Sequence, residues 1–361
     1  GSSATGNVQG TDRVGGLLGF MDNGTSLTLK SSFAQGSVTG TGTTGQVGGL
    51  TGAIYGYAYI YGSNYSGSGV LSSGSGVGGL LGENIYYDTT IYNSYVNSPG
   101  ITGTGNYVAG MVGGTSSATI SNSYVTSPIS STTTTANKLY FGGLVGDASS
   151  SATISNAYAI GNISVTGSGA GTSFVGGLVG RMGSSGGVVG GSMQNAYYSG
   201  TITTDANAVN YGGLAGYFRP GTWFSNSYYD MGNSTINGVS VLTVGGLYST
   251  QYDAWAKQGG ASVVVTPTSR LPLSIASAGL TQDATDATGK TYFISSTADL
   301  DKMLPFIQSA AGGAVNGYTF KLANDISMTG ATTAYLPYFG ATEFKGNTYS
   351  VNNFAYNRAA T

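Results

Sequence analysis

Hydrophobic positions in the first 250 residues form short runs of β-branched and aromatic residues, within which Ser and Thr alternate with the apolar side chains. Gly and Asn separate these runs, as they do at turns. The alternation matches the period of two of a β-strand. The i, i+3, i+4 spacing of an amphipathic helix is absent, and the frequent Gly pairs would cost a helix roughly 1 kcal/mol per glycine. The pattern predicts strands.

A glycine-rich hexamer recurs through this region, first as Val14-Gly15-Gly16-Leu17-Leu18-Gly19. Its eight copies occupy residues 14–19, 47–52, 77–82, 108–113, 141–146, 175–180, 211–216 and 244–249. Gly15 and Gly245, the second residues of the first and last copies, are 230 residues apart over seven intervals, so one unit is about 33 residues long. A motif similar to Asn-Ser-Tyr keeps step with the hexamer.

Each unit offers about three strands, which suits one rung of a solenoid. A propeller blade needs about 40 to 45 residues and four strands, and is therefore disfavoured. We predict an all-β fold, a right-handed parallel β-helix (β-solenoid) of about eight 33-residue rungs. Equivalent positions of successive rungs would stack about 4.8 Å apart. The Gly pairs have two explanations, either a positive φ at a sharp corner or close approach of two backbones.

Stacking predicts ladders of equivalent side chains. In the segment 120–124 strict alternation would place Ile120, Asn122 and Tyr124 on one face, which we expect to be the inner one, with the serines facing water. Aligned Asn side chains can pass amide hydrogen bonds from rung to rung. The expected structural ladder comprises Asn93, Asn122, Asn156, Asn195, Asn226, Tyr95, Tyr124, Tyr158, Tyr197 and Tyr228.

The recurrent Val-Gly-Gly-Leu-Val-Gly followed by Asn-Ser-Tyr resembles the GLUG-motif repeat of large bacterial surface adhesins. The resemblance covers residues 1 to about 250. It implies an exported fibrous adhesin related to filamentous haemagglutinin, released by two-partner secretion or an autotransporter route. The departures are Ala109 for the first Gly, Met111 for Leu, and Tyr248-Ser249 in the last copy.

The remaining residues have a higher density of charge. We expect residues 251–290 to form a closing strand and linker, and residues 291–361 to start a further β-helix section with one short helix. Ser296 to Asp299 resembles a capping box, and Leu300, Met303, Leu304 and Ile307 follow at helical spacing. This part resembles the segment that opens GLUG arrays. We therefore expect both ends to be cut from a longer chain.

Composition excludes several classes of function. Charged residues make up 7% of the chain and the net charge is −2, which gives no footprint for nucleic acid. No apolar stretch is long enough to span a membrane. The absence of Cys and His removes thiol nucleophiles, imidazole bases and the softer metal ligands. We expect no metal site and no cofactor.

The acidic residues do not cluster by rung in this interpretation. Asp88, Asp147 and Asp230 follow different positions of the repeat, and an isolated Asp in a turn usually caps the backbone. We therefore expect no catalytic residues and no enzyme activity.

One local feature is a run of alternating tyrosines. Strand periodicity places Tyr55, Tyr57, Tyr59 and Tyr61 on one face and Ile54, Ala58 and Ile60 on the other. Tyr86 and Tyr87 fall at the same phase of the next unit. If the aliphatic face is inside, these six residues form an external strip that could stack on sugars or meet a protein; otherwise the segment is a covered loop.

The leading functional hypothesis is a stalk and adhesive segment of a secreted bacterial fibre at the cell surface. Its expected partners are extracellular polysaccharide, host glycans or proteins, and flanking segments of the same long chain. Two alternatives stay open. One is a carbohydrate-active β-helix enzyme, such as a polysaccharide lyase or glycosidase, and the other is a matrix scaffold that binds exopolysaccharide and cross-links cells.

Overall fold

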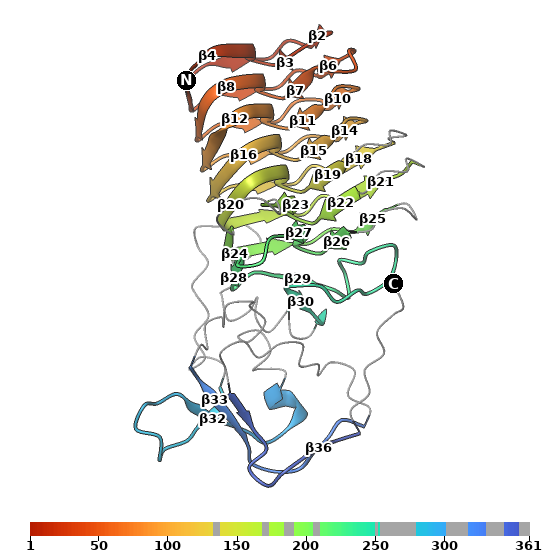
Figure 1. Ribbon diagram of the computed structural model, residues 1–361. Helices are drawn as coiled ribbons and strands as arrows, with labels where there is room; N and C mark the ends of the chain where they lie inside the picture. The colour runs from red at the N-terminus through yellow and green to blue at the C-terminus, as the bar shows by residue number, and fades with distance from the viewer. Residues whose placement is uncertain are drawn as a thin grey trace.

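The computed structural model describes residues 1–132, 138–167, 173–183, 191–204, 210–249, 252, 279–300, 317–329 and 343–353. Up to residue 247 the described chain winds into a stack of successive rungs, each of which lies directly on the next (Figure 1). Its strands form three parallel sheets that run along the stack. The all-β solenoid of about eight turns predicted from the repeat is confirmed.

The first and largest sheet carries the long strands that follow each hexamer. They are β4 (Leu18–Lys30), β8 (Thr51–Tyr61), β12 (Leu81–Tyr92), β16 (Val112–Ser121), β20 (Val145–Ala159), β23 (Val179–Met182), β24 (Ser192–Tyr198), β27 (Ala215–Phe218) and β28 (Trp223–Ser225). Short strands pair in the same sheet: β1 (Ser3–Ala4), β5 (Phe33–Ala34), β9 (Asn64–Tyr65), β13 (Tyr95–Val96), β17 (Tyr124–Val125), β29 (Tyr228–Asp230) and β30 (Gly246–Leu247).

The second and third sheets complete each rung. The second contains β2 (Val8–Gly10), β6 (Val38–Gly40), β10 (Val70–Ser72), β14 (Ile101–Gly103), β18 (Ile129–Ser131), β21 (Ile163–Val165) and β25 (Ile202–Thr203). The third contains β3 (Val14–Gly15), β7 (Gln46–Gly48), β11 (Gly76–Gly78), β15 (Tyr107–Ala109), β19 (Leu139–Gly142), β22 (Ser173–Gly176) and β26 (Asn210–Gly212).

Register pairs equivalent residues of the repeat. Val47, for example, pairs with Val14 on one side and Val77 on the other. The interior is consequently built of columns of similar apolar side chains. One column, with no exposed surface, is Leu50, Leu80, Met111, Leu144, Leu178 and Leu214.

The Gly pairs of the hexamers lie where two rungs and a facing side chain meet. A Cβ on Gly110 would be 2.2 Å from the carbonyl oxygen of Gly143 and 2.6 Å from Cγ1 of Val125. The φ angle of Gly110 lies outside the left-handed region, unlike that of Gly245 in the last hexamer. Close backbone approach therefore explains the second glycine of the hexamer, whereas the first position carries Ala109 in this same copy and a positive φ at Gly245 in the last one.

The predicted inner face of the segment 120–124 was wrong. Ile120 is buried as expected, but Ser123 is also buried, whereas Tyr124 lies on the outer surface of the rung, half-buried. The cause is Asn122, whose φ of 48° turns the chain and interrupts the alternation of faces. Asn is one of the few residues that adopt this left-handed conformation readily.

Buried serines, and not the asparagines that we expected, form the hydrogen-bonded ladder on the inner face of the rungs. Ser63 N–H donates to Oγ of Ser94 (3.2 Å), and Ser94 N–H donates to Oγ of Ser123 (3.0 Å). Each hydroxyl in turn donates to a backbone carbonyl, as Ser123 does to Ser121 (2.7 Å). These bonds satisfy polar groups that would be costly to bury alone.

The asparagines form their own chain of hydrogen bonds at the corner of the rung. Nδ2 donates to Oδ1 of the preceding rung from Asn156 to Asn122 (3.2 Å), from Asn195 to Asn156 (3.0 Å) and from Asn226 to Asn195 (2.7 Å). Asn93 has the same backbone conformation, with a φ of 50°. All five expected asparagines therefore occupy equivalent corners.

The tyrosines that follow these asparagines stack on the outside of the rungs. Ring centroids are 5.2 Å apart between Tyr95 and Tyr124, 5.0 Å between Tyr124 and Tyr158, and 4.8 Å between Tyr158 and Tyr197. Tyr158, Tyr197 and Tyr228 are buried in a second apolar cluster. That cluster also contains residues of the C-terminal strands.

The C-terminal strands form a separate small unit. Its sheets contain β31 (Thr281–Gln282), β32 (Thr291–Ile294), β33 (Thr319–Leu322) and β35 (Glu343–Lys345), and β34 (Ile326–Ser327) with β36 (Val351–Asn352). β32, β33 and β35 are parallel, and β31 is antiparallel to β32. Parallel pairing is what the expected further β-helix section requires.

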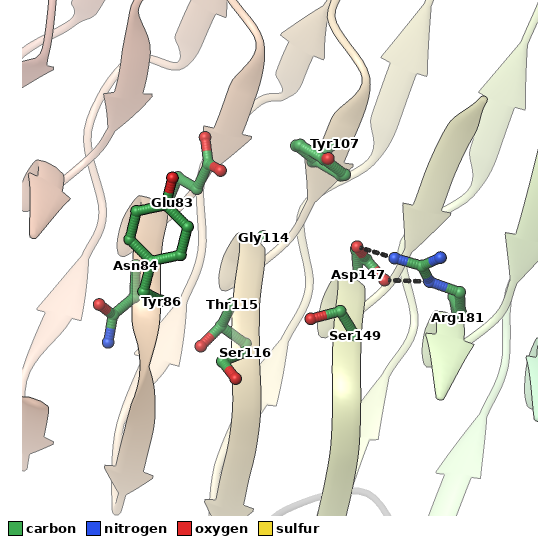
Figure 2. Close-up of a pocket in the computed structure, with 10 residues that line it drawn as sticks. All are labelled: Glu83, Asn84, Tyr86, Tyr107, Gly114, Thr115, Ser116, Asp147, Ser149 and Arg181. Atoms are coloured by element: carbon green, nitrogen blue, oxygen red, sulfur yellow. Dashed lines mark hydrogen bonds and ion pairs between the residues drawn. The ribbon is translucent and has the colours of Figure 1, made fainter. Parts of the chain in front are cut away.

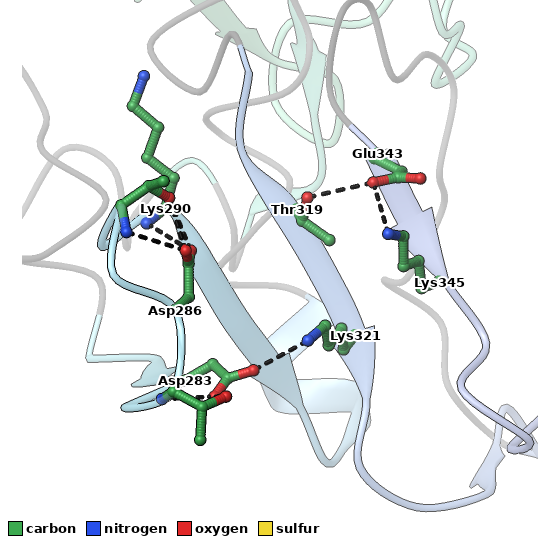
Figure 3. A network of polar contacts seen from close by, with 9 residues as sticks. Asp283, Asp286, Lys290, Thr319, Lys321, Glu343 and Lys345 are labelled. Carbon is green, nitrogen blue, oxygen red and sulfur yellow. Dashed lines mark hydrogen bonds and ion pairs between the residues drawn. The ribbon is translucent and has the colours of Figure 1, made fainter.

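Polar contacts hold this unit together (Figure 3). Lys321 Nζ lies 2.9 Å from Oδ2 of Asp283, which also accepts hydrogen bonds from Thr285. The bonds from Thr285 and Lys321 lower the pKa of Asp283 to about 2. The pKa of Asp286 is lowered too, by hydrogen bonds from the Thr291 side chain, from Thr288 and from the backbone of Lys290.

The predicted short helix begins where the sequence indicated. Residues 297–300 are helical, and the backbone N–H of Asp299 donates to Oγ of Ser296 (3.2 Å). Met303, Leu304, Pro305 and Ile307 lie outside the described residues, as do 251 and 253–278, most of the expected closing strand and linker. Across the described ranges, no helix is long and apolar enough to cross a bilayer.

Candidate functional site

The tyrosine run of β8 faces outward. Ile54, Ala58 and Ile60 have no exposed surface and pack in the core, which leaves the tyrosines on the other side of the strand. Tyr57 is 45% exposed, and Tyr55, Tyr59 and Tyr61 are half-buried. Of the two arrangements left open by the sequence, the external strip is the one present.

The strip extends to the next rung because β12 bulges. Its register with β16 shifts between Asn84 and Asp88, and Tyr86 within the bulge has a φ of 71° and is 85% exposed. The Tyr86 ring stacks on Tyr55 at 6.1 Å with an interplanar angle of 17°. Tyr87 makes an edge contact with Tyr57 at 5.3 Å. We call these six residues, Tyr55, Tyr57, Tyr59, Tyr61, Tyr86 and Tyr87, the tyrosine strip.

Beside the strip, one outward column has an unusual composition. It consists of the residues that immediately follow each hexamer, and register pairing joins them in the order Phe20, Ala53, Glu83, Gly114, Asp147, Arg181 and Tyr217. Gly114 has no side chain between Glu83 and Asp147. The gap opens into a hollow of about 300 Å³ (Figure 2). Its lining is Glu83, Asn84, Tyr86, Tyr107, Gly114, Thr115, Ser116, Asp147, Ser149 and Arg181.

The lengths of the bulges deepen this hollow. Three residues, 85–87, separate Asn84 from Asp88, and two, 149–150, separate Ala148 from Ser151. Between Thr115 and Ser117 of the rung in the middle there is only Ser116. The middle rung is therefore recessed between two neighbours that protrude.

Tyr107 forms the wall of the hollow on the third sheet, and a stack of aromatic rings continues from it along that sheet. Tyr107 stacks on Tyr140 at 5.6 Å, and Tyr140 stacks on Phe174 at 5.0 Å. The guanidinium carbon of Arg181 lies 4.3 Å from the centroid of Tyr140, within the range of a cation–π contact. Ring stacking and this contact hold Arg181 and Tyr107 in place around the hollow.

Two carboxyl groups lie on opposite sides of Gly114. Asp147 accepts two hydrogen bonds from Arg181, from Nε (2.6 Å) and Nη2 (2.5 Å), in a bidentate ion pair. Glu83 accepts one from Nε2 of Gln46 (3.2 Å). Burial raises the pKa of Glu83; the bond from Gln46 opposes the rise and the charge of Asp147 adds to it. Burial also raises the pKa of Asp147, against the bonds from Arg181.

Neutral polar groups complete the lining. Burial, together with the charges of Asp147 and Glu83, raises the pKa of Tyr107 to about 12, so its hydroxyl is a neutral donor and acceptor at physiological pH. Asn84 is 1% exposed and its Nδ2 donates to Thr89 (3.1 Å). Its Oδ1 has no hydrogen-bond partner among the described residues.

The interpretation that acids do not cluster by rung was wrong for Glu83 and Asp147. Each follows its hexamer directly, at residues 83 and 147, so the repeat itself contained the signal. It could be found only by aligning the units on the hexamer and comparing that one position. Asp230 does cap the backbone, since it accepts from Gly232 N–H (2.9 Å).

This surface offers hydrogen-bond donors and acceptors beside exposed aromatic rings. Among the described residues, no three acidic side chains come together as a cation site would require.

Comparisons with protein-family models, with curated proteins and with solved structures found no match.

Proposed function

We propose that this protein is a stalk and adhesive segment of a secreted bacterial surface fibre, which attaches to polysaccharide through the tyrosine strip. The observation that supports it most is the position of that strip on the outer face of a continuous stack of rungs. Equivalent columns repeat from rung to rung, so the backbone ladder resists bending and extends without a larger core. Such a body holds a binding surface at a distance from its anchor.

The composition of the strip fits a carbohydrate partner. Tyrosine rings present flat apolar faces to the C–H groups of sugars, and their hydroxyls remain available for hydrogen bonds. The exposed Asp22 and Lys30 pair with Tyr55 and Tyr61 on the adjacent strand, and such side chains can add hydrogen bonds to sugar hydroxyls. Extracellular polysaccharide and host glycans are the partners we propose, at the bacterial cell surface.

The test is retention of the protein on immobilised polysaccharides. Replacing Tyr55, Tyr57, Tyr59 and Tyr61 together with Ser is expected to lower retention by more than tenfold, because each lost aromatic contact weakens binding. Control variants Leu71→Ser and Tyr349→Ser remove exposed apolar residues elsewhere and should leave retention unchanged. Full retention by the fourfold variant, with an unaltered melting temperature, would reject the adhesive role of the strip.

A second candidate is a carbohydrate-active enzyme, and the carboxyl pair of the hollow favours it. Glu83 and Asp147 lie on strands two rungs apart, so their backbones are roughly 9.6 Å apart. Inverting glycosidases hold their two carboxyl groups about 6.5 to 9.5 Å apart, a separation that side chains can reach from strands spaced in this way. Asp147, however, is engaged by Arg181 through both oxygens, which weakens its role as a base. Release of reducing ends that disappears in Glu83→Gln would establish this alternative over the stalk.

A further inference from the structure

We infer that the hollow between Glu83 and Asp147 binds one uncharged sugar ring of the same polysaccharide chain that lies on the tyrosine strip. This inference rests on the proposed function, since it assigns to that surface a subsite and a class of sugar. Only Tyr86 belongs to both the hollow and the strip, and none of the proposed variants changes it, so the two can fail independently.

The size of the hollow suits a single ring. Its volume of about 300 Å³ is at the lower end for ligand pockets, which run to roughly 1,000 Å³. Gly114 is needed to keep this space, because a Cβ there would lie 3.3 Å from the ring of Tyr107 and 3.4 Å from Cγ of Glu83, closer than ordinary contact. Only side chains line it at that point, and no backbone atom is that close.

The polar lining matches the hydroxyl groups of a sugar. Ring hydroxyls can donate to the carboxyl oxygens of Glu83 and Asp147 and accept from the hydroxyl of Tyr107. Ser116 and Ser149 add two further hydroxyls at the mouth of the hollow. A polyol is the kind of ligand that can satisfy acceptors and donors in such a mixture.

Charge selects against acidic sugars. Two carboxyl groups face the hollow and only one guanidinium, that of Arg181, which is already paired with Asp147. A uronate carboxylate placed there would lie near Glu83 without a free cation to pair with, and burial of like charges is unfavourable. The hollow therefore favours neutral sugars over uronates.

Continuity with the strip supports a chain rather than a free monosaccharide. Tyr86 lines the hollow and also stacks on Tyr55. One sugar ring in the hollow and its neighbour over Tyr86 would belong to consecutive units of one polymer. Several weak contacts along a chain add to a useful affinity.

The experiment compares neutral oligosaccharides (gluco-, manno- and galacto-hexaoses) with hexagalacturonate, using the whole protein and titration calorimetry. Wild type is expected to bind at least one neutral hexaose at least tenfold more tightly than hexagalacturonate. Gly114→Val fills the hollow and should weaken that binding at least tenfold. Its control, Gly6→Val, makes the same addition in the first rung, where a Cβ would meet nothing within 4 Å, and should change nothing.

Tyr107→Phe is a second test of the hollow, which remains valid if Gly114→Val does not fold. It removes one hydroxyl and keeps the stacked ring, so the melting temperature should hold while neutral-sugar affinity falls severalfold. Unchanged affinity in both variants would overturn the subsite, and so would preference for hexagalacturonate. If the strip variant loses binding while these two keep it, the proposed function stands and the subsite fails. If wild type binds none of the four sugars, both fail.

Discussion

Two glycines in one rung, Gly110 and Gly114, have opposite roles. Gly110 lies in the corner, where a Cβ would meet the Gly143 carbonyl oxygen at 2.2 Å. At Gly114 the nearest atom to such a Cβ is a side-chain carbon 3.3 Å away. The first glycine is required because neighbouring backbones touch, whereas at the second only side chains crowd the position of a Cβ. The same residue type thus builds the scaffold at one position and shapes a surface at the other.

The contrast extends along the columns to which these glycines belong. The column of Gly110 continues as Gly79 and Gly143, with the same close approach in each rung. The column of Gly114 changes from Glu83 to Asp147 to Arg181. A column with the same residue type in every rung indicates a packing constraint that recurs. A column in which the residue type varies is less constrained by packing, so its side chains can serve a binding surface.

The sharpest way to break this comparison is to place the same methyl group at both glycines. Gly110→Ala is expected to destabilise the protein by about 3 kcal/mol, at the upper end of overpacking costs, because backbone must move. Gly114→Ala should change the free energy of unfolding by less than about 1 kcal/mol, since the alanine also lowers the entropy of the unfolded chain. Urea unfolding followed by circular dichroism measures both. Equal losses at the two positions would contradict the distinction.

Removing one hydroxyl from the serine ladder tests the buried polar interior. Ser123→Ala leaves the Ser94 N–H without its acceptor, so we expect a loss of about 1 to 3 kcal/mol in the free energy of unfolding. Ser130→Ala, on the outer side of β18, is the matched control and should cost far less. A neutral result for Ser123→Ala would mean that the ladder does not stabilise the rung.

The asparagine corner is expected to matter less. Asn156→Ala places a residue with a Cβ at a φ of 48° and breaks two amide hydrogen bonds, for about 1 to 2 kcal/mol in total. Asn156→Gly relieves the backbone conformation and loses only the amide bonds. The difference between the two unfolding energies measures the conformational part. If glycine were the more destabilising substitution, this assignment would be wrong.

The smallest effect concerns pH at the hollow. The pKa of Glu83 is raised above its ordinary value of 4.5, so its protonated form is favoured by folding. Its contribution to stability is fully present below pH 4.5 and is lost as the pH rises through the folded-state pKa. The Gln of Glu83→Gln does not ionise. The stability of this variant, measured against that of wild type, should therefore be higher at pH 7 than at pH 4. Thermal melts of both proteins at the two pH values check the sign.

Much of the scaffold could be predicted from residue spacing. The hexamers locate every rung, and the burial of Ile54 and Ala58 follows from alternation within β8. Alternation failed at Asn122 because a positive φ reverses the faces, which a pattern of residue types does not reveal. The hollow was also missed, because it depends on Gly114 and Ser116 being smaller and shorter than their neighbours in adjacent rungs.

The bulges of unequal length have a further consequence for how such a surface can change. The register recovers after each bulge, so that Ile91, Ile120 and Ile154 still align in the core. Inserting or deleting a residue inside a bulge therefore changes the shape of the outer surface at one rung and leaves the adjoining rungs in register. Mutation can remodel the outer topography of this molecule one residue at a time, and an engineer can use the same freedom.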